Sequence, residues 1–571
     1  MTARSVSVVL TGSGGSGVMT AGEMLLGAAA RAGLYGYMTR SSGPQIRGGE
    51  AAAMIRLSTT PISSHTDRYD LLLAIDWQNV GRFAAEMPLD ADSLVIGDPA
   101  MGEAPKEVIA MGARDAELPM QQLCKENKGW RPNMLALGAV AALIGLSEEH
   151  VIGLIQKKLK RKGEEAITLS VDAVKAGIKA ANEMPAVPKL GEGGADVSNR
   201  WSITGNEAAG LGAVRGGVRF VAAYPITPGT EILEWLAPSL KKLGGVLVQA
   251  EDELASVTQI IGASFGGIPS LTATSGPGLA LMMESIGLAV ASETPIVVID
   301  VQRGGPSTGI PTKSEQSDLN IALYGLHGDA PHLVVAPLSI GDCLFTTQWA
   351  VHLAEAMQTA CIVLSDQSIG QSRAIIDRPA DIAFIAKREI PEKLDETYRR
   401  YAITASGISP MSIPGTPGGQ YCADGLEHSP KGTPSSLADD HYAQMDKRLR
   451  KITGFNYGDH WAEIEGQGKT AVLTWGSCSS PVQEAIGRLR ETGKDVRLIA
   501  MRLLSPAQPE KLAAALEGVE RVLVIEQSHG GQFYRYLRAH YDLPGEVKSF
   551  RRPGPLPMRP KEIHDQLVDW S

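Results

Sequence analysis

Glu253 and Arg303 are the residues best suited to chemistry, because each follows an apolar run in a region whose loops hold few other charges. Glu253 lies in GVLVQAEDELAS, and Arg303 follows IVVIDVQ. A guanidinium group at the end of a strand can bind a carboxylate through two parallel hydrogen bonds. Glu253 can instead be one of three acids that favour the start of a helix. Arg303 can instead form a structural ion pair with Asp300 or Glu315.

Three apolar runs in this region end in loops rich in Gly, Pro, Ser and Thr. The segments are AAYPITPGTE (222–231), TATSGPGLALM (272–282) and IVVIDVQRGGPSTGIPTKSEQSDL (296–319). Such runs are typical of buried parallel strands, and open α/β sheets bind ligands where strand ends meet such loops. The sequence therefore predicts a ligand site at one edge of a parallel sheet.

Alternating strand and helix patterns divide the chain into α/β units joined by less regular segments. Residues 1–184 form the first unit, and a linker rich in Pro, Gly and Ala follows at 185–201. The second unit occupies 202–373. An irregular connecting region, 374–468, ends in a charged helix, and the last unit, 469–571, has a βαβαβ pattern. Three such units predict an α/β architecture.

The composition is that of a globular protein without a basic footprint. The 571 residues carry a net charge of −9, which disfavours nucleic-acid binding. The N-terminal apolar run is too short for a signal peptide, and the apolar stretch at 134–146 is too short to span a bilayer and predicts a buried helix. We therefore expect a cytoplasmic protein. The five cysteines form no CxxC pair, which argues against an iron–sulfur cluster held by four thiolates of this chain.

The N-terminal segment VVLTGSGGSGVMTAGEML has the strand–GxGxxG–helix pattern of dinucleotide-binding folds, with Gly12, Gly14 and Gly17. The acid expected about 20 residues further on is missing, since the next strand ends in YMTRSS and contains Arg40. An arginine there can bind the 2′-phosphate of NADP, so an NADP-dependent dehydrogenase is one alternative. The other alternative is a glycine turn that lets a helix pack closely on its strand without a ligand.

The order of the motifs resembles the 2-oxoacid:ferredoxin oxidoreductases. The matching segments are GSGGSGVMTAGEML, SSGPQIRGGEAAAMIRLS, GNEAAGLGAVRGG, AAYPITPGTE, QAEDELAS, TATSGPGLALM, QRGGPSTGIPTKSEQSDL and EQSHGGQF, which together span nearly the whole chain. The resemblance implies a large subunit with a gamma domain, a pyrimidine-binding domain for thiamine diphosphate and a transketolase C-terminal-like domain. It implies decarboxylation of a 2-oxoacid, transfer of the acyl group to coenzyme A, and electron transfer to ferredoxin. The glycine loop is then not a nicotinamide site.

The same resemblance implies a partner chain. The family's motif for binding Mg²⁺ and the diphosphate is GDG, and this sequence contains no GDG. A ligand set for an iron–sulfur cluster is also missing from the sequence. The resemblance therefore implies a beta subunit that carries the diphosphate site, Mg²⁺ and a [4Fe-4S] cluster, in a dimer of alpha–beta heterodimers.

Residue roles follow from the positions that match the family's motifs. Glu253 matches the glutamate that bonds N1′ of the thiamine pyrimidine, which favours the tautomer that deprotonates C2 of the thiazolium ring. Thr227 matches the threonine that contacts the substrate carboxylate, although it can also be a turn hydroxyl between two prolines. Arg303 is expected to bind the same carboxylate. Further cofactor contacts are expected from Tyr224, Pro225, Ser275 and Gly276.

The loop RGGPSTGIPTKSEQSDL resembles that of enzymes for 2-oxoglutarate and general 2-oxoacids more than that of the pyruvate type. A dicarboxylate needs a second polar or cationic group, for which Thr312 and Lys313 are candidates. We favour 2-oxoglutarate, converted to succinyl-coenzyme A and CO₂ or formed by the reverse reaction. Pyruvate and branched 2-oxoacids are alternatives. A non-catalytic scaffold is a further one, against which Glu253, Thr227 and Arg303 argue.

The sequence departs from the family's pattern in two loops. Gly229 stands where the family often has Ser after YPITP, which removes a hydroxyl near the pocket. The N-terminal loop reads Ser42-Gly43-Pro44-Gln45 where YGPE is common. Arg47, which follows in that loop, is expected either to meet coenzyme A phosphates or to make a contact between domains.

Overall fold

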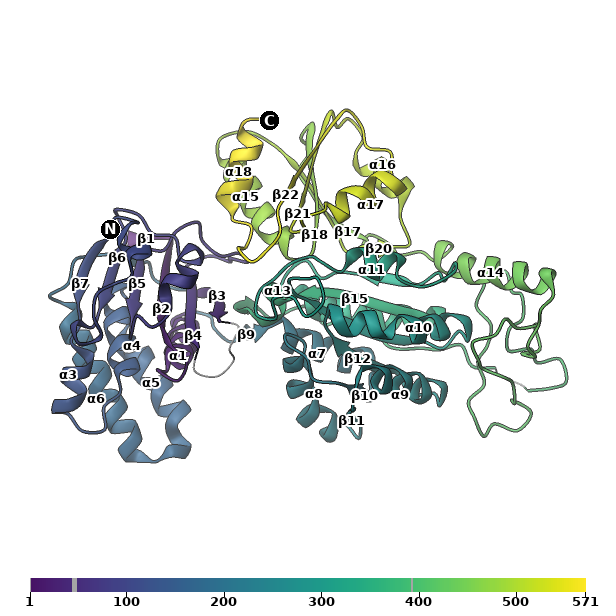
Figure 1. The fold of residues 1–571 in the computed structure, drawn as a ribbon, viewed down its shortest axis with the longest axis horizontal. Coiled ribbons are helices and arrows are strands. Elements are labelled where there is room, and N and C mark those ends of the chain that lie inside the picture. Colours follow the sequence, from purple (N-terminus) through teal and green to yellow (C-terminus); the bar gives the residue numbers. More distant parts are fainter. Residues whose placement is uncertain (1, 44–48, 392–393, 571) are drawn as a thin grey trace. The chain divides into compact units, whose positions relative to one another are not determined.

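The computed structural model describes residues 2–43, 49–391 and 394–570 (Figure 1). The chain forms two compact units, and each is assembled from segments that are distant in the sequence. One unit consists of Met1–Thr204, Gln371–Ala380 and Leu556–Ile563, and the other of Gly205–Gly370, Asp381–Pro555 and His564–Ser571. Within the described ranges, no helix combines the length and the apolar character needed to cross a bilayer.

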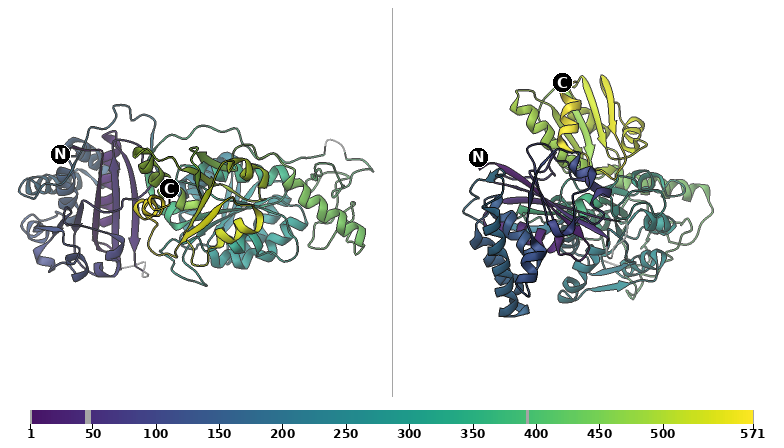
Figure 2. Two further views of the ribbon diagram at one scale, coloured as in Figure 1. Left: turned by 90° about the horizontal axis from the view of Figure 1, so that it is seen from above. Right: turned by 60° about the vertical axis from the view of Figure 1, so that its left-hand side comes forward.

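An eight-stranded mixed sheet forms the centre of the N-terminal unit (Figure 2), with the order β7-β6-β5-β2-β4-β3-β16-β9. Strands β2, β5, β6 and β7 pair in parallel, whereas β4, β3, β16 and β9 add to β2 in antiparallel pairs. The strands are β2 (Ser5–Ser13), β3 (Tyr35–Ser42), β4 (Glu50–Ser58), β5 (Leu71–Ala74), β6 (Leu94–Gly97), β7 (Arg114–Glu117), β9 (Arg200–Thr204) and β16 (Arg373–Asp377).

Two strands of this sheet come from segments outside residues 1–184. The segment 185–201, expected to be a linker, contains β8 (Lys189–Leu190) and the start of β9. Strand β8 pairs with β1 (Thr2–Ala3), and β9 pairs with β16. Strand β16 covers the edge of β3, whose backbone donors and acceptors would otherwise be unpaired. The N-terminal unit therefore continues beyond the linker.

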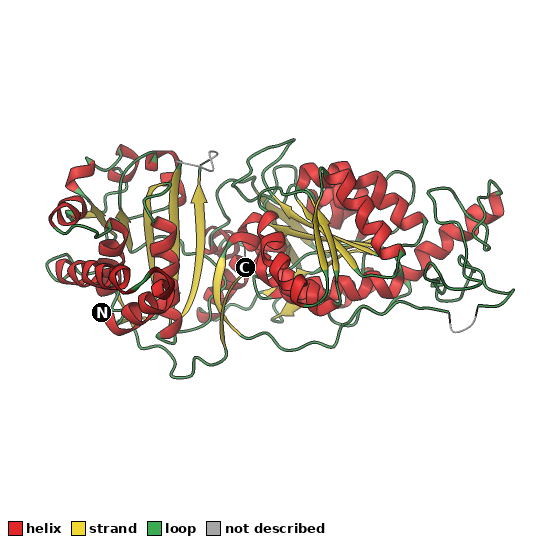
Figure 3. Ribbon diagram, turned by 90° about the horizontal axis from the view of Figure 1, so that it is seen from below, coloured by secondary structure: helices red, strands yellow, loops and turns green. Residues whose placement is uncertain are grey.

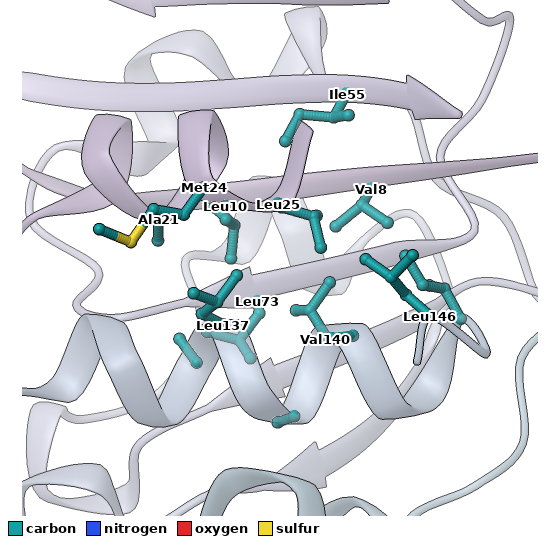
Figure 4. Packing of buried hydrophobic residues seen from close by; sticks show 14 of the residues in the cluster. Val8, Leu10, Ala21, Met24, Leu25, Ile55, Leu73, Leu137, Val140 and Leu146 are labelled. Carbon is teal, nitrogen blue, oxygen red and sulfur yellow. The ribbon is translucent and has the colours of Figure 1, made fainter. Parts of the chain in front are cut away.

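Helices α1, α4, α5 and α6 pack on one face of the sheet, and the alternation of side chains along β2 explains the arrangement. Val8 and Leu10 lie in the core shared with these helices, where they pack near Leu25 (Figure 4). Val9, one residue out of phase, lies in the core of the opposite face with Val80. The predicted buried helix at 134–146 is α4. The helices are α1 (Val18–Arg31), α2 (Lys106–Ile109), α3 (Met120–Glu126), α4 (Pro132–Leu143), α5 (Glu148–Leu159) and α6 (Glu164–Ala181), with 3₁₀ turns at Val80–Glu86, Pro99–Met101 and Lys160–Lys162.

A seven-stranded sheet in the second unit has the order β11-β10-β12-β13-β15-β14-β20, and all its pairs except β14–β20 are parallel. Helices lie on both sides of it (Figure 3). The three apolar runs identified in the sequence contain the ends of β10, β12 and β13. The strands are β10 (Phe220–Ala223), β11 (Val246–Gln249), β12 (Ser270–Thr274), β13 (Ile296–Gln302), β14 (Leu333–Val335) and β15 (Ala360–Asp366). The helices are α7 (Gly205–Gly216), α8 (Thr230–Lys242), α9 (Glu253–Phe265), α10 (Gly276–Ala291), α11 (Leu319–Tyr324), α12 (Asp342–Met357) and α13 (Gln367–Gln371).

The C-terminal part of this unit forms a five-stranded sheet with the order β17-β19-β18-β21-β22. It begins at β17, before residue 469, and β20 leaves it to pair with β14 of the seven-stranded sheet. The predicted α/β architecture is confirmed. The elements are β17 (Ala462–Glu465), β18 (Thr470–Trp475), a 3₁₀ turn at Gly476–Cys478, α15 (Ser479–Glu491), β19 (Arg497–Met501), β20 (Leu503–Ser505), α16 (Pro509–Ala515), β21 (Arg521–Glu526), α17 (Gln532–His540), β22 (Glu546–Arg551) and α18 (Pro560–Val568).

The connecting region is tied to the sheet by buried charges. Its described residues between 378 and 437 form no helix or strand, and α14 (Ala438–Thr453) follows. The carboxylate of Glu293 accepts hydrogen bonds from Nζ of Lys447 at 2.7 Å and Nζ of Lys451 at 2.9 Å, and these three side chains are fully buried. Nη2 of Arg400 donates to the carbonyl oxygen of Glu293 at 2.9 Å. This network fixes an otherwise irregular segment against the domain.

We expect Glu293→Gln to lower the free energy of unfolding by about 3–5 kcal/mol, because two buried lysines would lose their counter-charge. Burial alone would raise the pKa of Glu293, but the charges of Lys451, Lys447 and Arg400 hold it well below its ordinary value of 4.5. The unfolded chain therefore binds this proton at a higher pH than the folded chain does. The stabilisation is complete above about pH 4.5 and is lost as the pH falls below it.

Chemical denaturation over an acidic pH series measures this effect. The wild type should lose stability steeply on acidification, and Glu293→Gln should lose much less. Glu520→Gln removes a carboxylate whose ion pair with Lys469 is exposed, so this control should keep the steep acid dependence of the wild type. An unchanged acid dependence in Glu293→Gln would contradict the interpretation.

Candidate functional site

The carboxyl ends of β11, β10, β12 and β13 meet at one edge of the seven-stranded sheet, because these strands are neighbours and parallel. The residues that the sequence assigned to a site follow these ends. Tyr224, Pro225 and Thr227 come after β10, Glu253 after β11, Ser275 and Gly276 after β12, and Arg303 after β13. The topology therefore collects at one edge residues that are far apart in the chain.

Glu253 is the first residue of α9, and only 7% of its surface is exposed. The preceding Asp252 caps this helix, since its Oδ1 accepts a hydrogen bond from the amide of Ala255 at 2.7 Å. Glu253 is thus not needed as a cap, and its carboxylate forms no hydrogen bond or ion pair with the residues that the structure describes. Glu251, the alternative acid, is exposed. A buried carboxylate without a partner is costly unless a ligand supplies one.

Arg303 is also buried, with 6% of its surface exposed. Its Nη1 donates to the carbonyl oxygen of Thr227 at 2.6 Å, whereas its Nε is buried without a hydrogen-bond partner. Among the described residues, neither Asp300 nor Glu315 forms an ion pair with it, so the structural alternative is not realised. Burial lowers the pKa of Arg303, and the charges of Asp318 and Asp300 oppose that change. Most of the guanidinium donors remain available to an anion.

A cavity of about 770 Å³ lies over the ends of β12 and β13, and Arg303 forms part of its wall. Gly276 and Asp318 also line it from the sheet edge, and His529 lines it from the loop after β21. Burial raises the pKa of Asp318 to about 6 and also raises the pKa of Glu315, another wall residue. The wall of the cavity thus contains the guanidinium group of Arg303 and two carboxyl groups, those of Asp318 and Glu315, whose pKa values are raised by burial.

The other predicted substrate residues lie outside the cavity wall. Thr227 is joined to Arg303 through its carbonyl oxygen, while its hydroxyl forms no hydrogen bond with a described residue. Thr312 is 8% exposed and its hydroxyl is likewise without a described partner. Lys313 is half-buried, and its amide donates to the carbonyl oxygen of Ile310 at 3.2 Å. The structure therefore joins Thr227 to Arg303 through a hydrogen bond, whereas Thr227, Thr312 and Lys313 all lie outside the cavity wall.

Among the predicted cofactor contacts, Tyr224 is 41% exposed and Ser275 is fully buried. The hydroxyl of Ser275 has no hydrogen-bond partner in the described part of the chain. A Cβ on Gly278 would overlap the hydroxyl of Thr274 and lie 2.9 Å from Oε1 of Glu253. A glycine at 278 is therefore what allows the loop after β12 to approach Glu253 this closely.

Gly229 also has a spatial reason. A Cβ at this position would lie 2.9 Å from the carbonyl oxygen of Thr274. A serine, which is common at this position in the family that the sequence resembles, would crowd the backbone here. Glycine instead allows the loop after β10 to approach the end of β12.

Glutamines that the sequence analysis did not identify anchor the loop between Arg303 and Asp318. Gln316 is fully buried; its Nε2 donates to the carbonyl oxygen that ends β18 at 2.8 Å, and its Oε1 accepts from the amide of Gln527 at 2.7 Å. Nε2 of Gln532 donates to the carbonyl oxygen of Ser317 at 2.8 Å. A signal was present, since Gln527 and Gln532 both lie in the EQSHGGQF motif.

The N-terminal glycine loop has the predicted strand–loop–helix form, but its donors are occupied. The amide and the hydroxyl of Ser13 both donate to Oδ2 of Asp76, at 2.9 and 2.8 Å. The amide of Gly14 donates to the carbonyl oxygen of Gly49. A carboxylate thus takes the donor that a phosphate would need, which argues against dinucleotide binding.

The topology around this loop argues the same way. Strand β4 is inserted between β2 and β3 and is antiparallel to both, whereas a dinucleotide fold pairs the next strand directly and in parallel with the first. Nε of Arg40 donates to Oε1 of Gln371 at 3.4 Å. Gly22 of α1 approaches Ala53 so closely that a Cβ would lie 2.6 Å away, in keeping with a helix that packs tightly on its sheet. Arg47, with Pro44 and Gln45, lies outside the described residues.

Comparisons with known proteins agree with one another. Residues 211–447 match the family described as "Pyruvate flavodoxin/ferredoxin oxidoreductase, thiamine diP-bdg", and residues 7–180 match "Pyruvate ferredoxin/flavodoxin oxidoreductase". The chain is 34% identical over 378 residues to 2-oxoglutarate synthase subunit KorA of Methanothermobacter thermautotrophicus, which covers 66% of this chain and 100% of that protein. It is 27% identical over 597 residues to the 2-oxoacid:ferredoxin oxidoreductase subunit alpha of Saccharolobus solfataricus, covering 93% of each.

A solved structure also matches along almost the full length. It is a 2-oxoglutarate:ferredoxin oxidoreductase from Magnetococcus marinus with 2-oxoglutarate, coenzyme A and succinyl-CoA bound. The TM-score is 0.92 at 36% identity, and the match covers 99% of both chains. The fold of the present chain is therefore that of this protein.

We expect Gly278→Ala to destabilise the protein by about 1–3 kcal/mol, because the added methyl group would meet Thr274 and Glu253 in the packed first turn of α10. Gly287→Ala, in the same helix α10, is the matched control, since a Cβ there meets nothing within 4 Å. The control should be neutral or stabilising by about 0.5–1 kcal/mol through helix propensity. Thermal unfolding of both variants measures the difference, and equal midpoints would contradict the close approach.

Proposed function

Because the chain belongs to the family of the 2-oxoacid:ferredoxin oxidoreductases, as its motifs predicted, we propose that it is the large subunit of a 2-oxoglutarate:ferredoxin oxidoreductase. The enzyme converts 2-oxoglutarate and coenzyme A into succinyl-coenzyme A and CO₂, passing the electrons to ferredoxin, or runs the reverse reaction. The observation that carries the proposal is that Glu253 and Arg303 are buried at one sheet edge without a charged partner among the described residues. Each charge needs a ligand group of the complementary kind.

The surroundings of Glu253 fit the pyrimidine ring of thiamine diphosphate. The carboxylate is buried without a described partner, and Gly278 keeps side-chain atoms away from its Oε1. When bound, thiamine diphosphate supplies the chemistry that stabilises the carbanion left by decarboxylation. Glu253 would hold a proton between its carboxylate and N1′ of the ring, in a site where apolar walls strengthen that hydrogen bond. Ring contacts would come from Tyr224, Pro225, Ser275 and Gly276.

Arg303 and Thr227 would bind the carboxylate next to the oxo group of the substrate. The hydrogen bond from Arg303 to the carbonyl oxygen of Thr227 orients the guanidinium group, and the remaining donors can meet both oxygens of a carboxylate. The hydroxyl of Thr227 can donate a further hydrogen bond to the same group. Fixing the carboxylate in this way orients the bond that breaks when CO₂ leaves.

The edge that holds Glu253 is suited to burial by a second chain. Tyr224, Leu254 and Leu281 are large apolar residues with 41%, 49% and 52% of their surface exposed, and they follow β10, begin α9 and lie on α10. Large apolar residues exposed on these segments favour a protein interface. We infer a beta subunit that covers this edge and carries the diphosphate site, Mg²⁺ and a [4Fe-4S] cluster. It would transfer electrons to ferredoxin, in a dimer of alpha–beta heterodimers.

The preference for 2-oxoglutarate rests on two kinds of support. The names of the relatives from Methanothermobacter thermautotrophicus and Magnetococcus marinus refer to 2-oxoglutarate. Thr312 and Lys313 lie in the loop after Arg303 and offer a hydroxyl and an ammonium group for a distal carboxylate. The relative from Saccharolobus solfataricus is named for 2-oxoacids in general, so pyruvate and branched 2-oxoacids are the competing substrates.

With its partner subunit, the enzyme should reduce a viologen dye only when coenzyme A and a 2-oxoacid are both present, and fastest with 2-oxoglutarate. Glu253→Gln should lower kcat by about 10²–10⁴-fold, because the ring loses the carboxylate at N1′. Glu251→Gln is the matched control, since this nearby acid is exposed, and it should keep the wild-type rate. A Glu253→Gln variant with more than about a tenth of the wild-type rate would assign the role elsewhere. No turnover with any 2-oxoacid would refute the proposed function.

Thr312→Val should raise KM for 2-oxoglutarate by about tenfold or more and leave KM for pyruvate nearly unchanged, because only the longer acid carries a distal carboxylate that can accept the hydroxyl's hydrogen bond. Arg303→Lys should raise KM for both acids, since the planar fork is lost while the charge is kept. Steady-state kinetics with the two substrates measure the difference. Equal losses for both acids in Thr312→Val would place Thr312 at the shared oxoacid end.

A further inference from the structure

Two acids beside Arg303 have buried oxygens that no described group satisfies. Asp300, on β13, is fully buried, and both of its carboxyl oxygens lack a hydrogen-bond partner. Asp318, in the cavity wall, accepts from Oγ of Ser317 at 3.0 Å through Oδ1, but its Oδ2 is buried without a partner. An ionised carboxylate only accepts hydrogen bonds, so two ionised acids cannot satisfy one another. One proton on Asp300 turns it into a donor to Asp318 and supplies both acids with a partner.

The backbone around Asp318 keeps it in this place. Its amide donates to Oε1 of Gln302 at 3.0 Å, and Gln302 lies two residues after Asp300 on the same strand. On the opposite side, a Cβ on Gly276 would lie 2.7 Å from both carboxyl oxygens of Asp318. Thr274, on the neighbouring strand β12, stands in register with Asp300. Asp318 is therefore held between β13, which carries Asp300, and the first residue of α10.

Arg303 does not neutralise these acids. No ion pair joins it to Asp300 or Asp318 in the described part of the chain, although it is the cation whose charge acts on both. Glu315, from the loop after β13, is the other charged group that faces Asp318, and His529 acts on Glu315. Strands β12 and β15 contribute Thr274 and Leu364 opposite Asp300, neither of which titrates. The charge beside Arg303 thus depends on how many protons the two acids hold.

We propose that Asp300 and Asp318 share one proton, and that this acid–carboxylate pair positions Arg303 for the substrate carboxylate without pairing with it. The positioning role rests on the proposed function, whereas the shared proton does not. With one proton the pair adds a single negative charge next to the guanidinium group. Without it, a second negative charge would repel an anionic substrate and draw Arg303 toward the acids.

The titration behaviour of the two acids supports this arrangement. Burial and the charge of Asp318 raise the pKa of Asp300 well above its ordinary value of 3.8. Burial raises the pKa of Asp318 to about 6, against the opposing effect of its hydrogen bonds. Because the protonated form of a group persists below its pKa, the pair keeps its shared proton to a higher pH than an ordinary carboxyl group does and loses it as the pH rises further. Two carboxyls this close titrate as a unit.

The first test measures KM for 2-oxoglutarate from neutral to alkaline pH in the complete enzyme. The wild type should show a rise in KM at alkaline pH. Asp300→Asn should keep KM within about twofold of the wild type at neutral pH and lose the alkaline rise, because its amide donates to Asp318 without titrating. Asp300→Ala leaves Asp318 without a donor and should raise KM by about tenfold with a smaller effect on kcat. Glu315→Gln, which removes the other facing charge, should keep the alkaline rise.

The same alkaline rise in Asp300→Asn as in the wild type would overturn the proposal. So would a wild-type KM in Asp300→Ala. If Asp300→Ala fails to fold, the comparison of Asp300→Asn with the wild type still decides, since a purely structural role would not alter the pH profile of KM.

The second test needs no activity. The infrared spectrum of the full chain at neutral pH should contain the carbonyl stretch of a protonated carboxyl group that shifts in D₂O and is absent in Asp300→Asn. Absence of this band in the difference spectrum would overturn the shared proton. An enzyme inactive with every 2-oxoacid would overturn the proposed function and the positioning role with it, while the band would still establish the shared proton.

Discussion

A charge removed from water must find a partner, and this requirement separates the candidate site from the rest of the second unit. Elsewhere in that unit, two buried arginines are each paired with a carboxylate through two hydrogen bonds. Arg388 binds Glu355 through both carboxylate oxygens at 2.9 Å, and Arg502 binds Asp342 at 3.0 and 2.9 Å. Two others, Arg400 and Arg497, donate to two and three backbone carbonyl oxygens, whereas Arg303 donates to one. Arg303 lacks any such carboxylate partner among the described residues. The contrast within one unit is a stronger argument for a site than the burial of Arg303 alone.

The fold creates this exception by bringing backbone close to backbone. The carboxyl ends of the parallel strands lie at one edge of the sheet. Side chains on the loops that follow these strands would normally keep the loops apart. Gly229 lets the loop after β10 approach the backbone of Thr274, and Gly278 lets the first turn of α10 approach Glu253. The loop after β13 is then held by Gln316 on the five-stranded sheet. The site therefore depends on both sheets of the unit, and a change in the C-terminal sheet can alter the cavity without touching it.

Local pattern was sufficient to predict the parallel strands and the sheet edge that Glu253 and Arg303 both follow. Both depend on short apolar runs and on the rule that ligands bind at carboxyl ends. Strands β9, β16 and β20 were missed because their pairing partners are distant in the sequence, and the strands carry no distinctive periodicity. The anchoring role of Gln316 was missed for a related reason, since a buried glutamine in a loop is recognisable only when its backbone partners are known.

Groups left without partners destabilise a protein, so the open site must be tolerated by the rest of the unit. The network of Glu293, Lys447 and Lys451 joins an irregular segment and α14 to the sheet. This network lies at the opposite end of β13 from Arg303, because Glu293 follows α10 and precedes β13. The network can therefore stabilise the amino end of β13, while Arg303 at the carboxyl end of this strand is left without a carboxylate partner among the described residues. One strand thus connects a set of hydrogen-bonded buried charges to an arginine without a carboxylate partner among the described residues. The rigidity gained at the first end helps to hold the geometry required at the second.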